Sequence, residues 1–474
     1  MNVRSNSTRG IAVFGLALAS VLMAAAESPA ATPLPVQITA DDSGTGCASS
    51  TPVSDSTGTI AAWQSDCDPA TTNADGSTEI FRAIVGSAPV QLTDKTACTS
   101  SRPTISADGT RIAFESDCDL VGANADGNIE IFLWKNGTLS QLTTSTDCEN
   151  LAPSINGPGS FVAFDSTCNI FGTNNDGRGS EIYRVSVQGV LKQLTTDATG
   201  NCDSTSASID SSGNLVAFDS DCDLTGENEN LAVEIFTVTS AGAVRQLTFA
   251  PDDSCSSVHP EMDAAGTIVG FHSDCDFTGG NPDAGDEIFT VTTASRTVQQ
   301  VSSSPLGAAC ASGEVRMASS GGALAFSSYC KLAGNSDGSI EVYQVTLGGS
   351  SVGGLLAVTS GSDCSSMAGG LSADGSRVMF DSDCNPSGDN ADGSVEVFRA
   401  SACACGAPNT RRLPPQDPLA SDALLILKGA VGSASCAACE CDTNDDGKVS
   451  STDALRTLKA VVGEAGITLD CPSE

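Results

Sequence analysis

Histidine, aromatic residues and positive charge are all scarce in this 474-residue chain. It has 2 histidines, 4% aromatic residues, and 22 lysines and arginines against 58 aspartates and glutamates, so its formal net charge is −36. A surface of this charge repels nucleic acid and anionic lipid, which excludes both as partners, and it favours solubility and cation binding. Two histidines also leave little material for catalysis or metal binding by imidazole.

Long apolar runs are rare as well, and the only one lies at the N-terminus. Residues 1–26 read as a secretory signal, with Arg4 and Arg9 before the apolar stretch 11–23 and a small-residue cleavage site at 24–26. A membrane anchor is the alternative, but the run is short and no second apolar span of that length follows. Export agrees with 20 cysteines, because disulfides persist only in an oxidising compartment. We therefore expect a secreted protein, extracellular or periplasmic, without a membrane span.

Most of the cysteines form pairs that are 20 residues apart. A glycine follows the midpoint of each pair, as a tight hairpin turn requires, because one turn residue usually has a positive φ. Two cysteines equidistant from such a turn become cross-strand neighbours that a disulfide can join. The sequence therefore predicts seven hairpins, each closed by its own disulfide: Cys47–Cys67, Cys98–Cys118, Cys148–Cys168, Cys202–Cys222, Cys255–Cys275, Cys310–Cys330 and Cys364–Cys384.

The hairpins belong to a longer repeat of about 50 to 55 residues, a period typical of propeller blades. One unit reads PTISADG, RIAFESDCD, VGANADGNIEIFLW and LSQLT, which predicts four antiparallel strands. The seventh unit stops after its third strand, whereas residues 36–39 supply an unassigned fourth strand at the other end of the chain. An N-terminal strand that completes the last blade closes a ring and removes its free edges. We expect an all-β, seven-bladed β-propeller over residues 33–402; a linear solenoid is the alternative, and it leaves strand 36–39 unexplained.

These repeats resemble the TolB-like β-propeller family in their Ser-Ala-Asp-Gly turn, Ile-Ala-Phe strand, Glu-Ile-Phe strand and Gln-Leu-Thr ending. The resemblance covers roughly residues 33–402 and implies the fold. It implies little about function, because propellers carry many unrelated activities.

An acidic loop follows the second cysteine in nearly every unit. Its side chains could form a shallow calcium site in each blade, since hard cations take carboxylate and amide oxygens. They could also serve as turn residues, because Asn and Asp form Asx turns and Gly accepts a positive φ. Recurrence in nearly every blade favours the structural role. In the second unit the pattern is Asp117, Asp119, Asn124, Asp126, Gly127 and Glu130.

From about residue 403 the pattern changes to a Cys- and Pro-rich linker, 403–417, and then to helical periodicity in 418–474. Residues 442–453 match the spacing of an EF-hand-like calcium loop, with Gly447 at its sharp turn. A polar turn before a helix is the alternative. The expected ligands of one Ca²⁺ ion are Asp442, Asn444, Asp446, the Lys448 carbonyl, Ser450 and Asp453.

The same segment resembles a dockerin module, whose hallmark is a duplicated loop–helix unit. Here the motif at 421–424 returns 31 residues later at 452–455, but the first copy lacks calcium ligands, so the resemblance implies a single calcium ion. In dockerins, two loop positions help to choose the cohesin partner, which implies partner contacts by Ser451 and Thr452. A helix pair packed for stability alone is the rival interpretation.

Six further cysteines lie in the C-terminal part, and their pairing is open, since six allow 15 connectivities. A zinc site at Cys436 and Cys439 is the alternative to disulfides, which an exported chain favours. The six are Cys403, Cys405, Cys436, Cys439, Cys441 and Cys471.

Neither histidine lies in a recognisable catalytic motif. His272 takes the place of a polar loop residue, and its partner His259 lies in the same unit. TolB-like propellers include pectate-fragment lyases with a histidine-bound metal, but this chain lacks the histidines for such a site. We therefore expect no catalytic residue and a secreted binding or scaffold protein, whose propeller binds a protein or glycan and whose C-terminal module docks a cohesin-like or unknown protein. The alternatives are a carbohydrate-active enzyme, lyase or glycosidase, with carboxylates in the propeller channel, and a purely structural envelope protein.

Overall fold

The computed structural model describes most of the propeller and two short C-terminal helices. The expected signal 1–26, the linker 403–417 and the six C-terminal cysteines lie outside the described residues. The described ranges are 35–40, 46–172, 179–196, 202–251, 253–304, 310–332, 335, 337–348, 351–401, 420–431, 443 and 449–462.

Seven four-stranded antiparallel sheets form the blades of a β-propeller, as the repeat predicts. Blades 1 to 3 consist of β2 (Ser49–Ser54), β3 (Ile60–Ser65), β4 (Glu79–Ile84) and β5 (Val90–Gln91); β6 (Ser100–Ile105), β7 (Arg111–Ser116), β8 (Glu130–Lys135) and β9 (Thr138–Gln141); and β10 (Asn150–Ile155), β11 (Phe161–Ser166), β12 (Glu181–Ser186) and β13 (Leu191–Gln193). Blades 4 and 5 consist of β14 (Ser204–Ile209), β15 (Leu215–Ser220), β16 (Glu234–Thr239) and β17 (Val244–Gln246); and β18 (Ser257–Met262), β19 (Ile268–Ser273), β20 (Glu287–Thr292) and β21 (Val298–Gln300). Blades 6 and 7 consist of β22 (Ser312–Met317), β23 (Ala323–Ser328), β24 (Glu341–Gly348) and β25 (Ser351–Ala357); and β26 (Ser366–Leu371), β27 (Arg377–Ser382), β28 (Glu396–Ser401) and β1 (Val36–Gln37).

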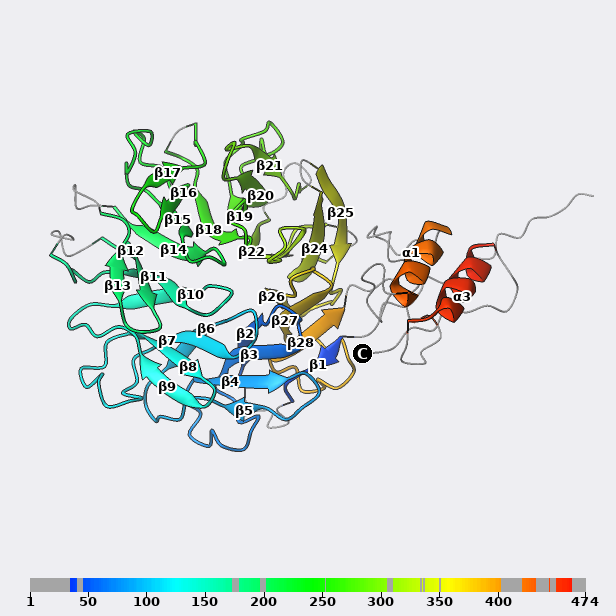
Figure 1. Cartoon of the computed structure of the whole chain (residues 1–474), viewed down its shortest axis with the longest axis horizontal. Helices are drawn as coiled ribbons and strands as arrows, with labels where there is room; N and C mark the ends of the chain where they lie inside the picture. The colour runs from blue at the N-terminus through cyan, green and yellow to red at the C-terminus, as the bar shows by residue number, and fades with distance from the viewer. Residues whose placement is uncertain are drawn as a thin grey trace, which may run out of the picture. The chain divides into compact units, whose positions relative to one another are not determined.

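The ring is closed by strands from the two ends of the propeller. β1 pairs with β28, with Val36 opposite Arg399 and Gln37 opposite Phe398. The first strand of each blade contacts the first strand of the next, including β26 against β2. Figure 1 shows these first strands nearest to the centre of the ring.

An aromatic pair fills the middle of every blade. One ring from the second strand stacks on one from the third; the Phe114 and Phe132 centroids, for example, are 5.8 Å apart. The aromatic residues that are scarce in the composition are thus concentrated where burial stabilises most. The pairs are Trp63–Phe81, Phe114–Phe132, Phe164–Tyr183, Phe218–Phe236, Phe271–Phe289, Phe326–Tyr343 and Phe380–Phe398.

The structure confirms the seven disulfides, one in each blade, with Cα–Cα distances of 5.1–5.2 Å. Each bond joins the residue two positions before the first strand to the residue two positions after the second. A polar pair lies beside it, such as Ser100 and Ser116, whose hydroxyl oxygens are 3.0 Å apart. The Ser116 oxygen also accepts the Cys118 N–H at 3.0 Å, so the half-cystine is held at the end of the hairpin.

The Glu-Ile-Phe and Gln-Leu-Thr motifs meet in a buried contact that we call the Glu–hydroxyl clamp. In blade 4, the Ile235 N–H donates to the Thr248 hydroxyl at 2.8 Å, and this hydroxyl donates to Glu234 at 2.5 Å. Glu234 also accepts the Ala250 N–H, so one carboxylate joins two strands and the following loop. A Thr or Ser hydroxyl accepts the equivalent N–H in all seven blades. In blade 7 that hydroxyl belongs to Thr39, two residues after β1.

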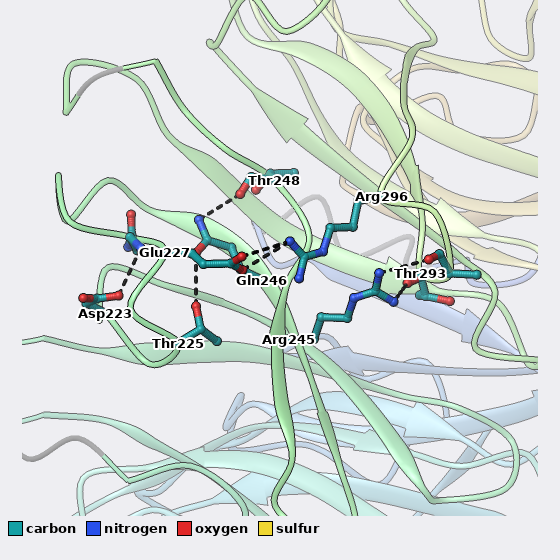
Figure 2. Close-up of polar contacts among 10 residues, drawn as sticks. Asp223, Thr225, Glu227, Arg245, Gln246, Thr248, Thr293 and Arg296 are labelled. Atoms are coloured by element: carbon teal, nitrogen blue, oxygen red, sulfur yellow. Dashed lines mark hydrogen bonds and ion pairs between the residues drawn. The ribbon is translucent and has the colours of Figure 1, made fainter.

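Neighbouring blades are also joined at their outer strands by arginine side chains. Between blades 4 and 5, Arg245 donates to the Thr293 carbonyl at 2.5 Å and to the Ala294 carbonyl at 2.9 Å (Figure 2). Arg296 of blade 5 forms an ion pair with Glu227 of blade 4 at 3.2 Å and lies over the Phe249 ring. These contacts are exposed or half-buried, so they contribute less than the buried clamps.

The C-terminal part contains α1 (Ala420–Ala430) and α3 (Ser451–Val461), which pack on each other. Ile426 and Ala454 form the centre of this contact, with Val449 packed against it. No helix among the described residues is long and apolar enough to cross a membrane. The many disulfides indicate an oxidising, extracytoplasmic compartment.

Candidate functional site

The start of α3 is fixed by a capping box. Ser450 has an extended backbone, and its hydroxyl accepts the Thr452 N–H at 3.2 Å. Asp453 in return accepts the Ser450 N–H at 2.8 Å. The other Asp453 oxygen accepts the Thr443 N–H at 2.9 Å, so this fully buried carboxylate also holds the segment before the helix.

Of the six expected calcium ligands, the structure places two. Ser450 and Asp453 lie together in the capping box, whereas Asp442, Asn444, Asp446 and Lys448 lie outside the described residues. The Thr443–Asp453 hydrogen bond brings the two ends of the 442–453 segment together, which a closed ion-binding loop also requires. Calcium binding therefore stays a prediction, as do partner contacts by Ser451 and Thr452, which are both exposed.

The helix pair divides its apolar residues between two faces in a duplicated way. Ala423 and Ala454, which are 31 positions apart, are both 6% exposed, and Ile426 and Thr457 are fully buried. The exposed apolar face repeats with the same offset. It comprises Leu424 (54%) and Leu427 (41%) on α1 with Val431 (70%) directly after it, and Leu455 (53%) and Leu458 (42%) on α3 with Val462 (71%) directly after it. The 3–4 spacing of Ala454, Leu455, Leu458, Val461 and Val462 predicts an apolar stripe on this helix, but Leu455, Leu458 and Val462 are exposed rather than packed on α1.

A second arrangement encircles the propeller axis. The third residue of each first strand lies at or beside an irregularity in strand pairing, and in six blades it has a positive φ. In six blades its N–H donates to a side chain of the second strand of the preceding blade, and for the seventh the preceding blade has His272 at that position; the Thr51 N–H, for example, donates to Asp381 at 2.9 Å. We call these seven side chains the axial ring: Gln64, Glu115, Asp165, Asp219, His272, Ser327 and Asp381. Six of them accept this bond, from Arg102, Ala152, Ser206, His259, Ala368 and Thr51.

Three carboxylates of the axial ring have raised pKa values because they are buried. Burial raises the pKa of Asp165 to about 7, and the nearby charges of Asp219 and Glu115 add to this effect. Burial likewise raises the pKa of Asp381 to about 7, and it raises that of Asp219. Each already accepts a backbone N–H from the next blade, so the ring carboxylates hold blades together rather than standing as a free acid–base pair.

Blade 5 departs from this pattern because His272 occupies its ring position. Sequence analysis places His272 in a polar loop; the structure corrects this, since His272 lies within β19. Its Nε2 lies 3.0 Å from His259 Nδ1, so these two nitrogens face each other. The two rings are stacked, with centroids 5.2 Å apart and an angle of 8° between the ring planes. His272 Nδ1 is buried without a hydrogen-bond partner, and burial lowers the pKa of His272 to about 4. Within the part of the chain that the structure describes, neither ring hydrogen-bonds to a hydroxyl or carboxylate.

The acidic loops are built from turn contacts. In blade 1, Asp68 accepts the Asn73 N–H at 2.7 Å, and Asn73 donates to the Cys67 and Ser77 carbonyls, both at 2.9 Å. The corresponding Asn contacts recur at Asn124, Asn228, Asn281 and Asn390. These contacts are those of the turn interpretation, in which the polar side chains satisfy loop backbone groups.

No protein-family profile matches the chain, and no curated protein matches it. Solved structures of similar fold include TolB from Acinetobacter baumannii, with 14% identity and a TM-score of 0.38 over 76% of this chain and 64% of that one. They also include oligogalacturonate lyase from Vibrio parahaemolyticus (12% identity, TM-score 0.49, 79% of this chain and 99% of that one). A third is a GH74 enzyme from Niastella koreensis, with 11% identity and a TM-score of 0.45 over 74% of this chain and 53% of that one.

The chain therefore spans 64% of the length of the TolB structure. The similar structures include both enzymes and TolB, and at these identities they share the fold alone with this chain. The strand order and the disulfides assign a seven-bladed β-propeller that is similar in structure to TolB and other propeller proteins.

Proposed function

We propose that this chain is a secreted, non-enzymatic binding protein whose C-terminal helix pair docks onto a protein partner. The observation that carries the proposal is the duplicated apolar face, Leu424, Leu427 and Val431 with Leu455, Leu458 and Val462, all between 41% and 71% exposed. Single exposed apolar residues are ordinary, but three on each of two helices that pack together, repeated at the same offset, are more than a folded domain usually exposes, and such exposure is typical of protein interaction sites.

Calcium would organise this face in our proposal. The predicted ion, held by Asp442, Asn444, Asp446, Lys448, Ser450 and Asp453, lies directly before α3 in the sequence. Asp453 already caps α3, so an ion at this carboxylate would couple the loop to the position of the helix. On this basis the module is dockerin-like, and its partner is a cohesin-like protein. The propeller is then the attached binding domain, for a protein or glycan.

The test uses the full oxidised chain immobilised on a surface. Cohesin modules and the extracellular fraction of the source organism are passed over it, with calcium and with chelator. We expect calcium-dependent binding that Leu424→Asp/Leu455→Asp weakens by at least about tenfold, because charges placed in a desolvated patch oppose binding.

Val190→Asp is the matched control, since Val190 is an equally exposed apolar residue (70%) of the propeller. It should bind like the unmodified chain. Binding that survives the double substitution, or no binding in any arm, contradicts docking through this face and leaves the helices with a stabilising role.

A further inference from the structure

The loop between the second and third strands holds its asparagine in one orientation. In blade 5, Asn281 Nδ2 donates to the Gly285 carbonyl at 2.8 Å and to the Cys275 carbonyl at 3.4 Å. Because carbonyls can only accept, these two bonds identify the amide nitrogen and leave Oδ1 on the other side. The equivalent bonds in blades 1 and 7 give their asparagines the same orientation.

In blades 1 and 7, a serine hydroxyl lies against that free amide oxygen. Ser394 Oγ is 3.4 Å from Asn390 Oδ1, 2.9 Å from Asp392 Oδ1 and 3.1 Å from Glu396 Oε1. Ser77 makes the same three contacts in blade 1, and Ser339 contacts the corresponding Asp and Glu in blade 6. We call this place, where three oxygen atoms surround one hydroxyl, the hub position.

Blade 5 has no side chain at the hub position, because the residue there is Gly285. Asn281 is 1% exposed, and its Oδ1 has no hydrogen-bond partner. Ser304 Oγ is buried and also lacks a partner. A Cβ atom added to Gly285 would lie 3.9 Å from that Oγ and 3.4 Å from the Cys310 carbonyl oxygen. Two buried, unsatisfied oxygens therefore border a space that another blade fills with a hydroxyl.

Two acidic residues of blade 5 stand at the sequence positions that border the hub in blade 7. Asp283 occupies the position of Asp392, and Glu287 that of Glu396, with the same spacing from the asparagine. Glu287 accepts the Ser304 N–H at 2.5 Å, which brings the carboxylate beside Ser304.

The other loops that the structure describes in full differ from blade 5 in the residue at the hub position or in the acidic residues around it. Blade 2 has the Asn128 amide at the hub, where it donates to Glu130 at 3.0 Å. Blade 4 has a buried Ala232 methyl there, and Asn230 in place of the aspartate. Among the loops that the structure describes in full, blade 5 alone combines an empty hub, two unsatisfied oxygens and two carboxylates.

We propose that the hub position of blade 5 binds a hard divalent cation of the calcium class. Its oxygen ligands are Asn281 Oδ1, Ser304 Oγ and the carboxylates of Asp283 and Glu287. Calcium takes amide, hydroxyl and carboxylate oxygens in irregular geometry and tolerates ligands from a flexible loop. A water molecule could satisfy the two neutral oxygens, whereas a cation can be bound by the neutral oxygens and the carboxylates together. This site is separate from the calcium loop predicted before α3.

The test is calcium titration calorimetry on the full oxidised chain carrying Asp442→Ala/Asp446→Ala, so that the C-terminal loop does not contribute. We expect one calcium site and a rise in melting temperature with millimolar calcium, since a ligand of the native state stabilises it. Gly285→Ser places the blade-7 hydroxyl in the hub and should weaken binding by at least about tenfold. Asp283→Asn should do the same without adding a side chain.

Two matched controls accompany these variants. Gly313→Ser inserts the same hydroxymethyl group where no atom lies within 4 Å, and Asp392→Asn changes the equivalent carboxylate of blade 7, whose hub is filled by Ser394. Both should bind calcium like the parent chain. The proposal is overturned if the parent chain binds no calcium, or if Gly285→Ser and Asp283→Asn, folded as judged by their melting transitions, bind as tightly as the controls.

Discussion

The Glu–hydroxyl clamps and the axial ring are both seven-fold sets of hydrogen bonds, yet they differ in how much their residues vary. Every blade has the glutamate, and in every blade a Thr or Ser hydroxyl accepts the N–H of the residue that follows it. The ring uses Gln64, Glu115, Asp165, Asp219, His272, Ser327 and Asp381 for one equivalent position. A buried carboxylate that accepts both a hydroxyl and a backbone N–H, as Glu234 does, permits little change, whereas a ring side chain needs only one acceptor atom. The clamps therefore define the blade, and the ring is where blades can differ.

Breaking a clamp should have the largest effect. Glu234→Ala removes the acceptor of the buried Thr248 hydroxyl and of the partly buried Ala250 N–H. We expect a loss of about 4 kcal/mol in the free energy of unfolding, at 1–3 kcal/mol for each unsatisfied group plus the lost packing. Urea denaturation measures this loss. Glu227→Ala, an exposed carboxylate of the same blade, should cost less than about 1 kcal/mol; equal losses would contradict the assigned role of the clamp.

Replacing the Asp381 carboxylate with an amide should stabilise the protein at high pH, in contrast to the loss expected for Glu234→Ala. The folded-state pKa of Asp381, about 7, is above its ordinary value of 3.8. Its contribution to stability is thus complete below pH 3.8 and is lost as the pH rises through 7. Asp381→Asn keeps an acceptor for the Thr51 N–H, as Gln64 does for Arg102 in blade 1. We expect its stability relative to the parent chain to improve by about 3 kcal/mol between pH 5 and pH 8.

The control for that experiment is Asp389→Asn, an exposed carboxylate of blade 7. Denaturation at both pH values should show no pH-dependent gain for it. A flat difference between Asp381→Asn and the parent chain would mean that the Asp381 carboxylate is not buried as described.

Replacing His272, the one histidine of the axial ring, should have the smallest effect on stability. Its pH dependence is opposite to that of Asp381, because the His272 contribution is lost as the pH falls. The folded-state pKa of His272 is about 4, below its ordinary value of 6.5, so its contribution is present above pH 6.5 and is lost as the pH falls toward 4. His272→Ser copies blade 6, where Ser327 accepts the Ala368 N–H at 2.7 Å. Between pH 6.5 and pH 4, we expect the free energy of unfolding of the parent chain to fall by about 2 kcal/mol more than that of His272→Ser.

Proton NMR checks the same assignment directly, because the chain has only 2 histidines. One imidazole resonance should titrate near pH 4 and disappear in His272→Ser. A resonance of His272 that titrates at 6.5 would show that the His259–His272 contact does not exclude the proton.

The blades could be predicted from the sequence because their determinants are local. Cysteine spacing, midpoint glycines and the recurring Phe and Glu-Ile-Phe strands each report one hairpin, and strand 36–39 reports the closure. The axial ring could not be predicted in the same way, because its partners are neighbours only across two blades; Asp381 and Thr51, for example, are 330 positions apart. The polar residue three positions before the second cysteine was the available signal, and sequence analysis placed it in a loop.

The hub position was also hidden from sequence reasoning. The loop pattern indicates that Asn281, Asp283 and Glu287 recur, but it does not reveal which amide oxygen is left unsatisfied. That depends on Gly285 and on Ser304 from the following segment, which the repeat does not align. In the helix pair, periodicity gave the apolar stripe without the division into a buried and an exposed face, because that division depends on where α1 packs.

The pairing of the blade cysteines has a consequence for how the protein is made. Every bond joins two cysteines that follow each other directly in the chain, 20 residues apart. A chain that emerges from a translocation pore N-terminus first therefore exposes each thiol just before its correct partner. An oxidase that couples thiols in order of appearance would form all seven bonds without reshuffling, before β1 can meet β28.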